Sequence, residues 1–193
     1  QLSTGWVERW GHAAVCLNGT IVTTGGQNNA GTYLSDVYST TAGETILTEV
    51  SSSFNAFNQR RWGHSVARDP SPGRSSSFML IGGFGGVYLN DAWVTTDDGK
   101  IFTKVSDSVF TSSDGRYFGG LVAFEDTRLN ATTWIAFGGG RHDTTEYYNE
   151  IRSSTDNGAT WTTLRDNGGG LGDNCPNQTL WSGRVGFGYA YLT

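Results

Sequence analysis

The chain consists of short stretches in which apolar and polar residues alternate, and no stretch has the period of an α-helix. Near the start of the chain, four such stretches cover residues 12–17, 20–24, 34–39 and 45–50. Asn18-Gly19 separates the first two, and this dipeptide between apolar runs is a strong signal for a tight β-hairpin. The pattern therefore predicts four antiparallel strands in this part of the chain.

The same order of strands and turns follows twice more. The second set of predicted strands covers 64–68, 77–81, 90–95 and 101–105, and the third covers 121–125, 133–137, 150–154 and 160–164. A glycine doublet ends the second strand of every set: Gly25-Gly26, Gly82-Gly83 and Gly138-Gly139. The doublets recur roughly every 57 residues, a period that is typical of stacked or radial repeats.

Each set also opens on a related tetrapeptide, and a fourth opening stands near the end of the sequence. The four are Arg9-Trp10-Gly11-His12, Arg61-Trp62-Gly63-His64, Arg116-Tyr117-Phe118-Gly119 and Arg184-Val185-Gly186-Phe187. Because the arginines and histidines of these openings recur in register, we expect their side chains to tie neighbouring repeats together. The residues concerned are Arg9, His12, Arg61, His64, Arg116 and Arg184.

Four antiparallel strands in a repeat of about 50 residues form one blade of a β-propeller. We therefore expect an all-β fold over 1–193, with three complete blades at about 9–52, 61–107 and 116–166 and the first strand of a fourth at about 181–193. The first repeat already has its own opening strand, so the last strand has no place to fill there. The sequence predicts that the open edges are completed by other copies of the chain, in a ring or a filament, or by the remainder of a longer propeller.

The residues after the glycine doublets resemble the kelch repeat. Tyr88-Leu89-Asn90-Asp91-Ala92-Trp93 carries the resemblance, and Tyr33-Leu34-Ser35-Asp36-Val37-Tyr38 and Tyr147-Tyr148-Asn149-Glu150-Ile151-Arg152 are weaker copies. The resemblance implies the propeller fold. It leaves the function open, because kelch propellers include enzymes, adaptors and structural proteins.

A second pattern resembles the Asp-box hairpin of sialidase-like propellers. It occurs at 95–102 and 154–161, and a third, degraded copy at 39–46 has Thr41 in place of the aspartate. A turn aspartate accepts backbone N–H groups and a glycine adopts positive φ, so we interpret these residues as structural. They are Asp97, Gly99, Asp156, Gly158 and Trp161.

Antiparallel strands alternate in direction, so their loops sort onto two ends of the fold. Loops on one rim of a rigid scaffold are where binding sites are most often found. The candidate binding residues lie on the rim opposite the Asn18-Gly19 turn, and they are Gln27, Asn28, Trp62, Phe84, Tyr117, Arg141, His142 and Asp143.

Composition and processing signals indicate which partners are excluded and where the protein is located. The net charge of −5 argues against nucleic-acid partners, and no run of 18 apolar residues is present that could span a membrane. Sequons at Asn18, Asn130 and Asn177 and a start at Gln1 without a methionine or an apolar leader are typical of a mature secreted glycoprotein. Cys16 and Cys175 fit one disulfide, within a chain or between two chains. We therefore expect an extracellular, secreted or cell-surface protein.

Candidate catalytic groups do not converge in the sequence. A sialidase would need an arginine cluster and a nucleophilic tyrosine with an acidic partner, but the arginines here stand mostly at repeat openings. Tyr147 and Tyr148 are adjacent to each other, and neighbours in a strand point to opposite faces. A copper oxidase of the kelch class would need Cys, Tyr and His ligands, and with two Cys and three His no metal or cofactor is predicted.

Three functions follow from these patterns. The first hypothesis is a non-catalytic secreted glycoprotein that builds or binds, as a matrix, surface or filament component. The second is a lectin-like propeller that binds glycans through rim aromatics such as Trp10 and Trp62. The third is a sialidase-like glycoside hydrolase that uses Tyr147 or Tyr148.

Overall fold

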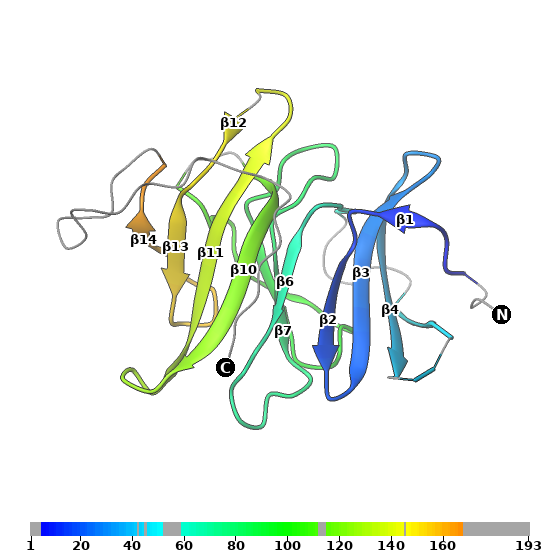
Figure 1. Ribbon diagram of the computed structural model, residues 1–193, viewed down its shortest axis with the longest axis horizontal. Coiled ribbons are helices and arrows are strands. Elements are labelled where there is room, and N and C mark those ends of the chain that lie inside the picture. Colours follow the sequence, from blue (N-terminus) through cyan, green and yellow to red (C-terminus); the bar gives the residue numbers. More distant parts are fainter. Residues whose placement is uncertain are drawn as a thin grey trace.

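The computed structural model describes residues 5–41, 43–44, 46–51, 59–111, 115–144 and 146–167. These residues form strands and turns and include no helix, which confirms the predicted all-β fold (Figure 1). The predicted fourth opening at Arg184, the strand at 181–193, Asn177 and Cys175 lie outside the described residues. In the part of the chain that is described, no helix could cross a membrane.

The strands form three antiparallel sheets in sequence order. Sheet 1 contains β1 (Arg9–Trp10), β2 (Ala13–Leu17), β3 (Thr20–Asn28), β4 (Tyr33–Thr41) and β5 (Thr48–Ser51). Both β1 and β2 pair with β3, so together they occupy the first of four strand positions in the sheet. The four positions follow one another in sequence order, as in a propeller blade.

Sheets 2 and 3 repeat this order. Sheet 2 contains β6 (Ser65–Arg68), β7 (Phe78–Ile81), β8 (Ala92–Thr95) and β9 (Thr103–Ser106). Sheet 3 contains β10 (Tyr117–Asp126), β11 (Ala131–Arg141), β13 (Ile151–Ser154) and β14 (Thr162–Arg165), and the short β12 (Glu146–Tyr147) pairs with the end of β11. Three successive sheets, each with four main strand positions, are the architecture expected of a propeller.

Two strands continue past the glycine doublets at which their predicted ranges end. β3 and β11 continue through their glycine doublets, although alternation of apolar and polar residues stops before them. Gly25 has φ of 55° and Gly26 has φ of 107°, and the pairing of β3 with β4 shifts register between Thr24 and Gly26. Glycine adopts these angles without a steric penalty, so the strand bends at the doublet and continues to the rim.

The sheets pack face to face, and sheet 2 is buried on both sides. All four residues of β7 are buried. Phe78 and Leu80 pack with apolar side chains of sheet 1, whereas Met79 and Ile81 pack with those of sheet 3. Strand side chains alternate between the two faces, so one four-residue strand contributes to two cores. The first strands β2, β6 and β10 are neighbours (Figure 1).

Backbone hydrogen bonds join the sheets at equivalent positions. The N–H of Gly26 donates to Arg61 O at 2.9 Å, and the N–H of Gly83 donates to Arg116 O at 2.7 Å. In return, Arg61 N–H donates to Leu34 O at 3.0 Å and Arg116 N–H donates to Leu89 O at 3.1 Å. The repeat openings therefore join neighbouring blades through their main chain.

The arginine side chains of the openings act differently from the prediction. Each guanidinium binds within its own sheet: Arg9 pairs with Asp36, Arg61 with Asp91 and Arg116 with Glu150. The expectation that these side chains tie neighbouring repeats was wrong for Arg9, Arg61 and Arg116, because an acidic residue in or just before the third main strand of the same sheet neutralises each of them. It holds for the buried His64, whose Nε2 lies 2.7 Å from Thr24 Oγ1 of sheet 1.

Candidate functional site

The loops β3–β4, β7–β8 and β11–β12 lie at one end of the molecule, which we call the rim (Figure 1). The hairpins β2–β3 and β10–β11, with Asn18 and Asn130 at their tips, lie at the opposite end (Figure 1). Both asparagines are exposed and have φ of 49°, as a tight hairpin turn requires. The two ends therefore differ in chemistry.

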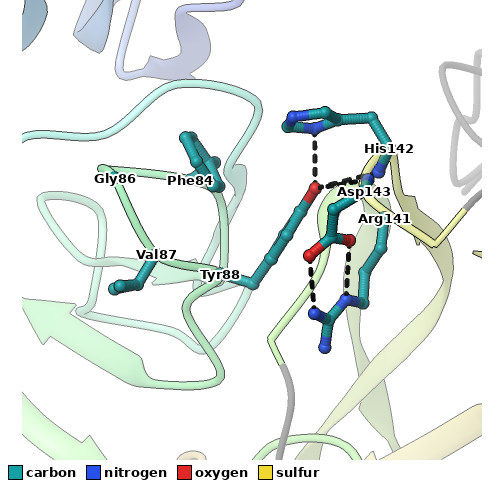
Figure 2. Close-up of a pocket in the computed structure, with 7 residues that line it drawn as sticks. All are labelled: Phe84, Gly86, Val87, Tyr88, Arg141, His142 and Asp143. Atoms are coloured by element: carbon teal, nitrogen blue, oxygen red, sulfur yellow. Dashed lines mark hydrogen bonds and ion pairs between the residues drawn. The ribbon is translucent and has the colours of Figure 1, made fainter.

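A pocket of about 390 Å³ opens at the rim between sheets 2 and 3 (Figure 2). Its lining consists of Phe84, Gly86, Val87, Tyr88, Arg141, His142 and Asp143. Four of these, Phe84, Arg141, His142 and Asp143, are among the residues predicted from the sequence to bind. The volume lies in the range of small-ligand sites. We refer to this feature as the rim pocket.

The sheet 2 side of the rim pocket is a tight hairpin at 84–88. Phe84 forms isolated β-bridges with Trp62 and with Tyr88, and Gly85-Gly86-Val87 makes the turn. A Cβ on Gly85 would stand 2.0 Å from the carbonyl oxygen of Arg60, so only glycine fits against that neighbouring segment. The hairpin therefore places the rings of Phe84 and Tyr88 side by side, with centroids 4.8 Å apart.

Tyr88 joins the hairpin to the loop of the next sheet. Its Oη accepts the backbone N–H of His142 at 2.9 Å and that of Asp143 at 3.3 Å, and it lies 2.6 Å from Nδ1 of His142 (Figure 2). The Tyr88 hydroxyl and Nδ1 of His142 therefore share a hydrogen bond that fixes the orientation of the ring. Nε2 is the second polar atom of the exposed His142 imidazole.

The carboxylate of Asp143 is held by Arg141 through two hydrogen bonds. Nε of Arg141 donates to Oδ1 at 3.1 Å and Nη2 donates to Oδ2 at 2.8 Å. The Arg141 hydrogen bond, with its charge, lowers the pKa of Asp143 to about 2. The carboxyl is therefore charged at every physiological pH, and its side chain remains 46% exposed.

Two other predicted rim residues, Trp62 and Tyr117, pack beneath the rim pocket without lining it. Trp62 is buried, and its ring contacts those of Trp10, Phe84 and Tyr117. Tyr117 in turn contacts the His142 ring with centroids 5.8 Å apart. These rings form a packed layer beneath the rim, where Trp62 cannot stack on a ligand.

Gln27 and Asn28 are the last two residues of β3 in sheet 1, next to the β3–β4 loop. Gln27 Nε2 donates to Gly31 O, and Asn28 Oδ1 accepts the N–H groups of Ala30 and Thr32. Asn28 thus shapes its own loop. The structure places both residues away from the rim pocket, whose lining comes from sheets 2 and 3.

Sequence reasoning missed Tyr88, Gly86 and Val87 as separate site residues. Tyr88 stands in the kelch-like stretch, which served only as a sign of the fold. The signal that could have found it is its position: Tyr33, the equivalent residue, also contacts the loop of the next sheet, through Phe84 at a centroid distance of 5.7 Å. In both of the first two sheets, the tyrosine that opens the kelch-like stretch therefore reaches across a junction.

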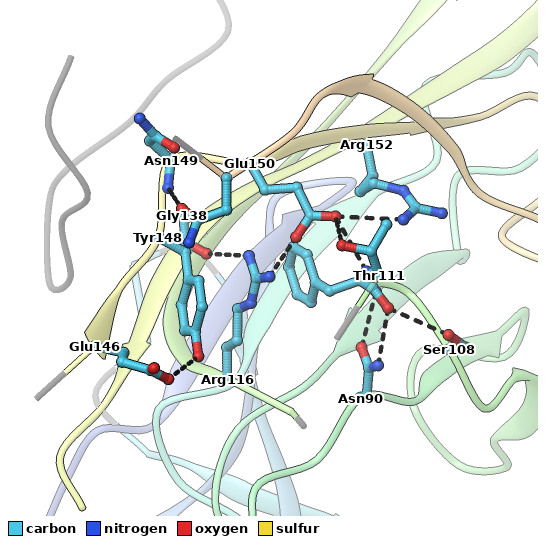
Figure 3. Close-up of polar contacts among 12 residues, drawn as sticks. Asn90, Ser108, Thr111, Arg116, Gly138, Glu146, Tyr148, Asn149, Glu150 and Arg152 are labelled. Carbon is cyan, nitrogen blue, oxygen red and sulfur yellow. Dashed lines mark hydrogen bonds and ion pairs between the residues drawn. The ribbon is translucent and has the colours of Figure 1, made fainter. Parts of the chain in front are cut away.

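The candidate catalytic tyrosines do not share a site. Tyr147 is half-exposed, whereas Tyr148 is buried and donates its hydroxyl to Glu146 at 2.7 Å (Figure 3). The hydrogen bond to Glu146 adds to burial, and the pKa of Tyr148 rises to about 12. A phenol with this pKa is a poor nucleophile at neutral pH. The arginine near it, Arg116, is occupied by the buried Glu150 (Figure 3).

The turn residues predicted at 95–102 and 154–161 form local hydrogen bonds. Asp97 Oδ1 accepts the N–H of Lys100 at 3.1 Å and that of Ile101 at 3.0 Å. Asp156 Oδ1 accepts the N–H of Thr160 at 2.9 Å. Gly99 and Gly158 have φ of 90° and 84°, and Trp161 Nε1 donates to Gly158 O at 3.0 Å.

The predicted disulfide has one member in the described part of the chain. Cys16 is an exposed free thiol on β2. Its pairing with Cys175 stays a prediction. Among the described residues, no group of three or more His, Cys, Asp or Glu side chains could hold a metal ion.

The geometry can be compared with known protein families. The family model of the Kelch motif matches residues 8–39, from the start of sheet 1 through most of β4. This match to sheet 1 supports the propeller fold. No curated protein matches the sequence.

Proposed function

We propose that this protein is a non-catalytic binding propeller and that its ligand binds in the rim pocket. The observation that carries the proposal is the preorganised pair of polar groups there: the His142 imidazole fixed by Tyr88, and the Asp143 carboxylate fixed by Arg141. Both stand beside the rings of Phe84 and Tyr88. Groups held in place before binding lose little conformational entropy when a ligand arrives.

The comparison of two exposed aliphatic residues tests this proposal. Val87 on the rim pocket is 57% exposed and Leu129 at the opposite end is 58% exposed, so Val87→Asp and Leu129→Asp are a matched pair. We expect Val87→Asp to weaken binding of extracellular proteins or oligosaccharides to the immobilised chain at least tenfold and Leu129→Asp to leave it unchanged. Equal effects of the two variants would contradict a ligand site at the rim.

We propose that the protein is secreted and carries N-glycans at the end opposite the rim. The support is the exposure of Asn18 and Asn130 at hairpin tips of that end. On expression in a eukaryotic secretory host, peptide N-glycosidase treatment should reduce the mass of the protein, and Asn18→Gln and Asn130→Gln should each remove one glycan. A protein whose mass is unchanged by the glycosidase would refute the assignment.

We propose that the hairpins at 95–102 and 154–161 are Asp-boxes with a structural role. Their support is that the hydrogen bonds of Asp97 and Asp156 stay within the turns. Turn chemistry accounts for these residues without a catalytic role.

We propose that the open sides of the three-sheet unit are completed by further blades, from another copy or from a longer propeller. At both described junctions the opening arginine offers its N–H and carbonyl to the preceding sheet, and Arg9 stands at the same position in sheet 1. Size-exclusion chromatography with light scattering should find assemblies larger than one 193-residue chain. A stable monomer that does not aggregate would contradict completion by another copy.

A further inference from the structure

The formal charges of the rim pocket cancel. Its lining contains one cation, Arg141, and one anion, Asp143, which bind each other through two hydrogen bonds. The exposed His142 adds the polar atom Nε2 to the lining. A phosphate, a sulfate or an acidic side chain would meet no uncompensated positive charge there, and an exposed carboxylate would repel it.

The polar groups of the rim pocket suit a ligand that both donates and accepts hydrogen bonds. The Asp143 carboxylate only accepts hydrogen bonds, and Nε2 of His142 is the second hydrogen-bonding atom that this loop presents. The two residues are adjacent in one loop whose backbone is held by Tyr88 Oη. A hydroxyl group both donates and accepts, so neighbouring hydroxyl groups can donate to the carboxylate and bind the imidazole at the same time.

The remaining lining is apolar and concave. Phe84 and Tyr88 contribute rings and Val87 contributes an exposed aliphatic side chain. Protein partners bury roughly 1,200 Å² or more at specific interfaces. A pocket of about 390 Å³ with converging polar groups has instead the size of a small-ligand site.

We infer that the rim pocket binds a neutral saccharide unit, with hydroxyl groups on Asp143 and His142 and a C–H face against Phe84 and Val87. The inference rests on the proposed binding function and names its ligand class. Arg141 and Tyr88 are positioning residues, since they hold the two polar groups in place through the contacts described above.

An oligosaccharide array that contains neutral and acidic glycans tests the ligand class with the full chain. We expect the neutral glycans to bind. In titration calorimetry with a bound neutral oligosaccharide, Asp143→Asn and His142→Ala should each raise the dissociation constant about tenfold or more. Glu146→Gln is the matched control, because Glu146 is an exposed carboxylate of the same loop region that does not line the rim pocket. Its dissociation constant should equal that of the wild type.

The outcomes separate the saccharide assignment from the binding function. The assignment to a neutral saccharide is overturned if only acidic glycans bind. It is also overturned if Asp143→Asn and His142→Ala leave the binding of neutral glycans unchanged. If no glycan binds but a protein partner does, and Val87→Asp removes it, the saccharide assignment fails and the binding function stands. If Val87→Asp weakens the binding of neither glycans nor proteins, both the saccharide assignment and the binding function of the rim pocket fail.

Discussion

At the residue scale, the most buried charges are arginines of the repeat openings and the acidic residue Glu150. Glu150 is completely buried and binds Arg116, Arg152 and the hydroxyl and N–H of Thr111 (Figure 3). Burial alone would raise the pKa of Glu150, but Arg116 and Thr111 outweigh it, so the pKa lies below the usual range. The charged form of Glu150 is therefore part of the folded structure.

Glu150→Gln should destabilise the protein strongly. The substitution keeps the size of the side chain but leaves Arg116 and Arg152 without a counter-charge, and breaking a buried ion pair costs about 3–5 kcal/mol. Urea unfolding measures the loss. Glu125→Gln, at an exposed carboxylate of β10, is the control and should change the free energy of unfolding by less than about 0.5 kcal/mol. A loss below about 1 kcal/mol for Glu150→Gln would show that the pair contributes little.

His64 should make stability depend on pH. Burial lowers its pKa to about 3, with Arg61 and His12 adding to the effect. In the unfolded chain the group titrates near 6.5, so the unfolded state binds more protons between these values and stability falls as pH drops below about 6.5. Unfolding free energies at pH 7 and pH 5 should differ by on the order of 2 kcal/mol in the wild type. In His64→Asn the difference should be smaller, and an equal difference would refute this origin.

At the scale of single elements, local chemistry is what the sequence predicts well. The positions of the hairpins followed from Asn18-Gly19 and from the Asp-Gly pairs, because each turn is stabilised by residues within it. Strand ends were predicted less well. β3 and β11 continue past the point where the alternation of apolar and polar residues stops. They do so because they pair with β1 and β12 near the rim, and a local sequence pattern does not reveal such pairing.

Asp156→Ala tests the turn at this scale. Asp156 accepts hydrogen bonds from Ser154, from the N–H of Thr160 and from its hydroxyl. Their loss should cost about 1–2 kcal/mol in urea unfolding. Asp107→Ala is the matched control, because Asp107 is 84% exposed and its ion pair with Lys104 is at the surface. Equal losses in the two variants would mean that the turn carboxylate adds no stability of its own.

At the scale of the whole molecule, the rim pocket depends on contacts that no local pattern reveals. Tyr88 and His142 are 54 residues apart in sequence. Phe84, Arg141, His142 and Asp143 were found because rim loops could be sorted by strand direction. Which of those loops meet was not predictable. Gln27 and Trp62 were included although Gln27 lies at the end of β3 in another sheet and Trp62 is buried.

The packing of sheet 2 between its neighbours implies that the three sheets unfold together. Gly25 tests this coupling, because a Cβ there would stand 2.6 Å from Arg61 O of the next blade. Gly73 is the control: it has φ of 79°, against 55° for Gly25, and a Cβ there would meet nothing within 4 Å. Both Gly→Ala changes strain the backbone by roughly 1 kcal/mol, and only Gly25→Ala adds a clash across the junction.

Hydrogen exchange gives the decisive measurement for this coupling. Because Phe78 and Met79 of the same strand serve two different cores, sheet 2 and sheet 3 should lose stability when the junction between sheets 1 and 2 is disturbed. We expect Gly25→Ala to lower the opening free energies of amides in β3, β7 and β11 by similar amounts, and by more than Gly73→Ala does. Loss confined to β3, with β11 unchanged, would show that the blades are independent units, because a cooperative unit loses protection throughout when one of its joints is weakened.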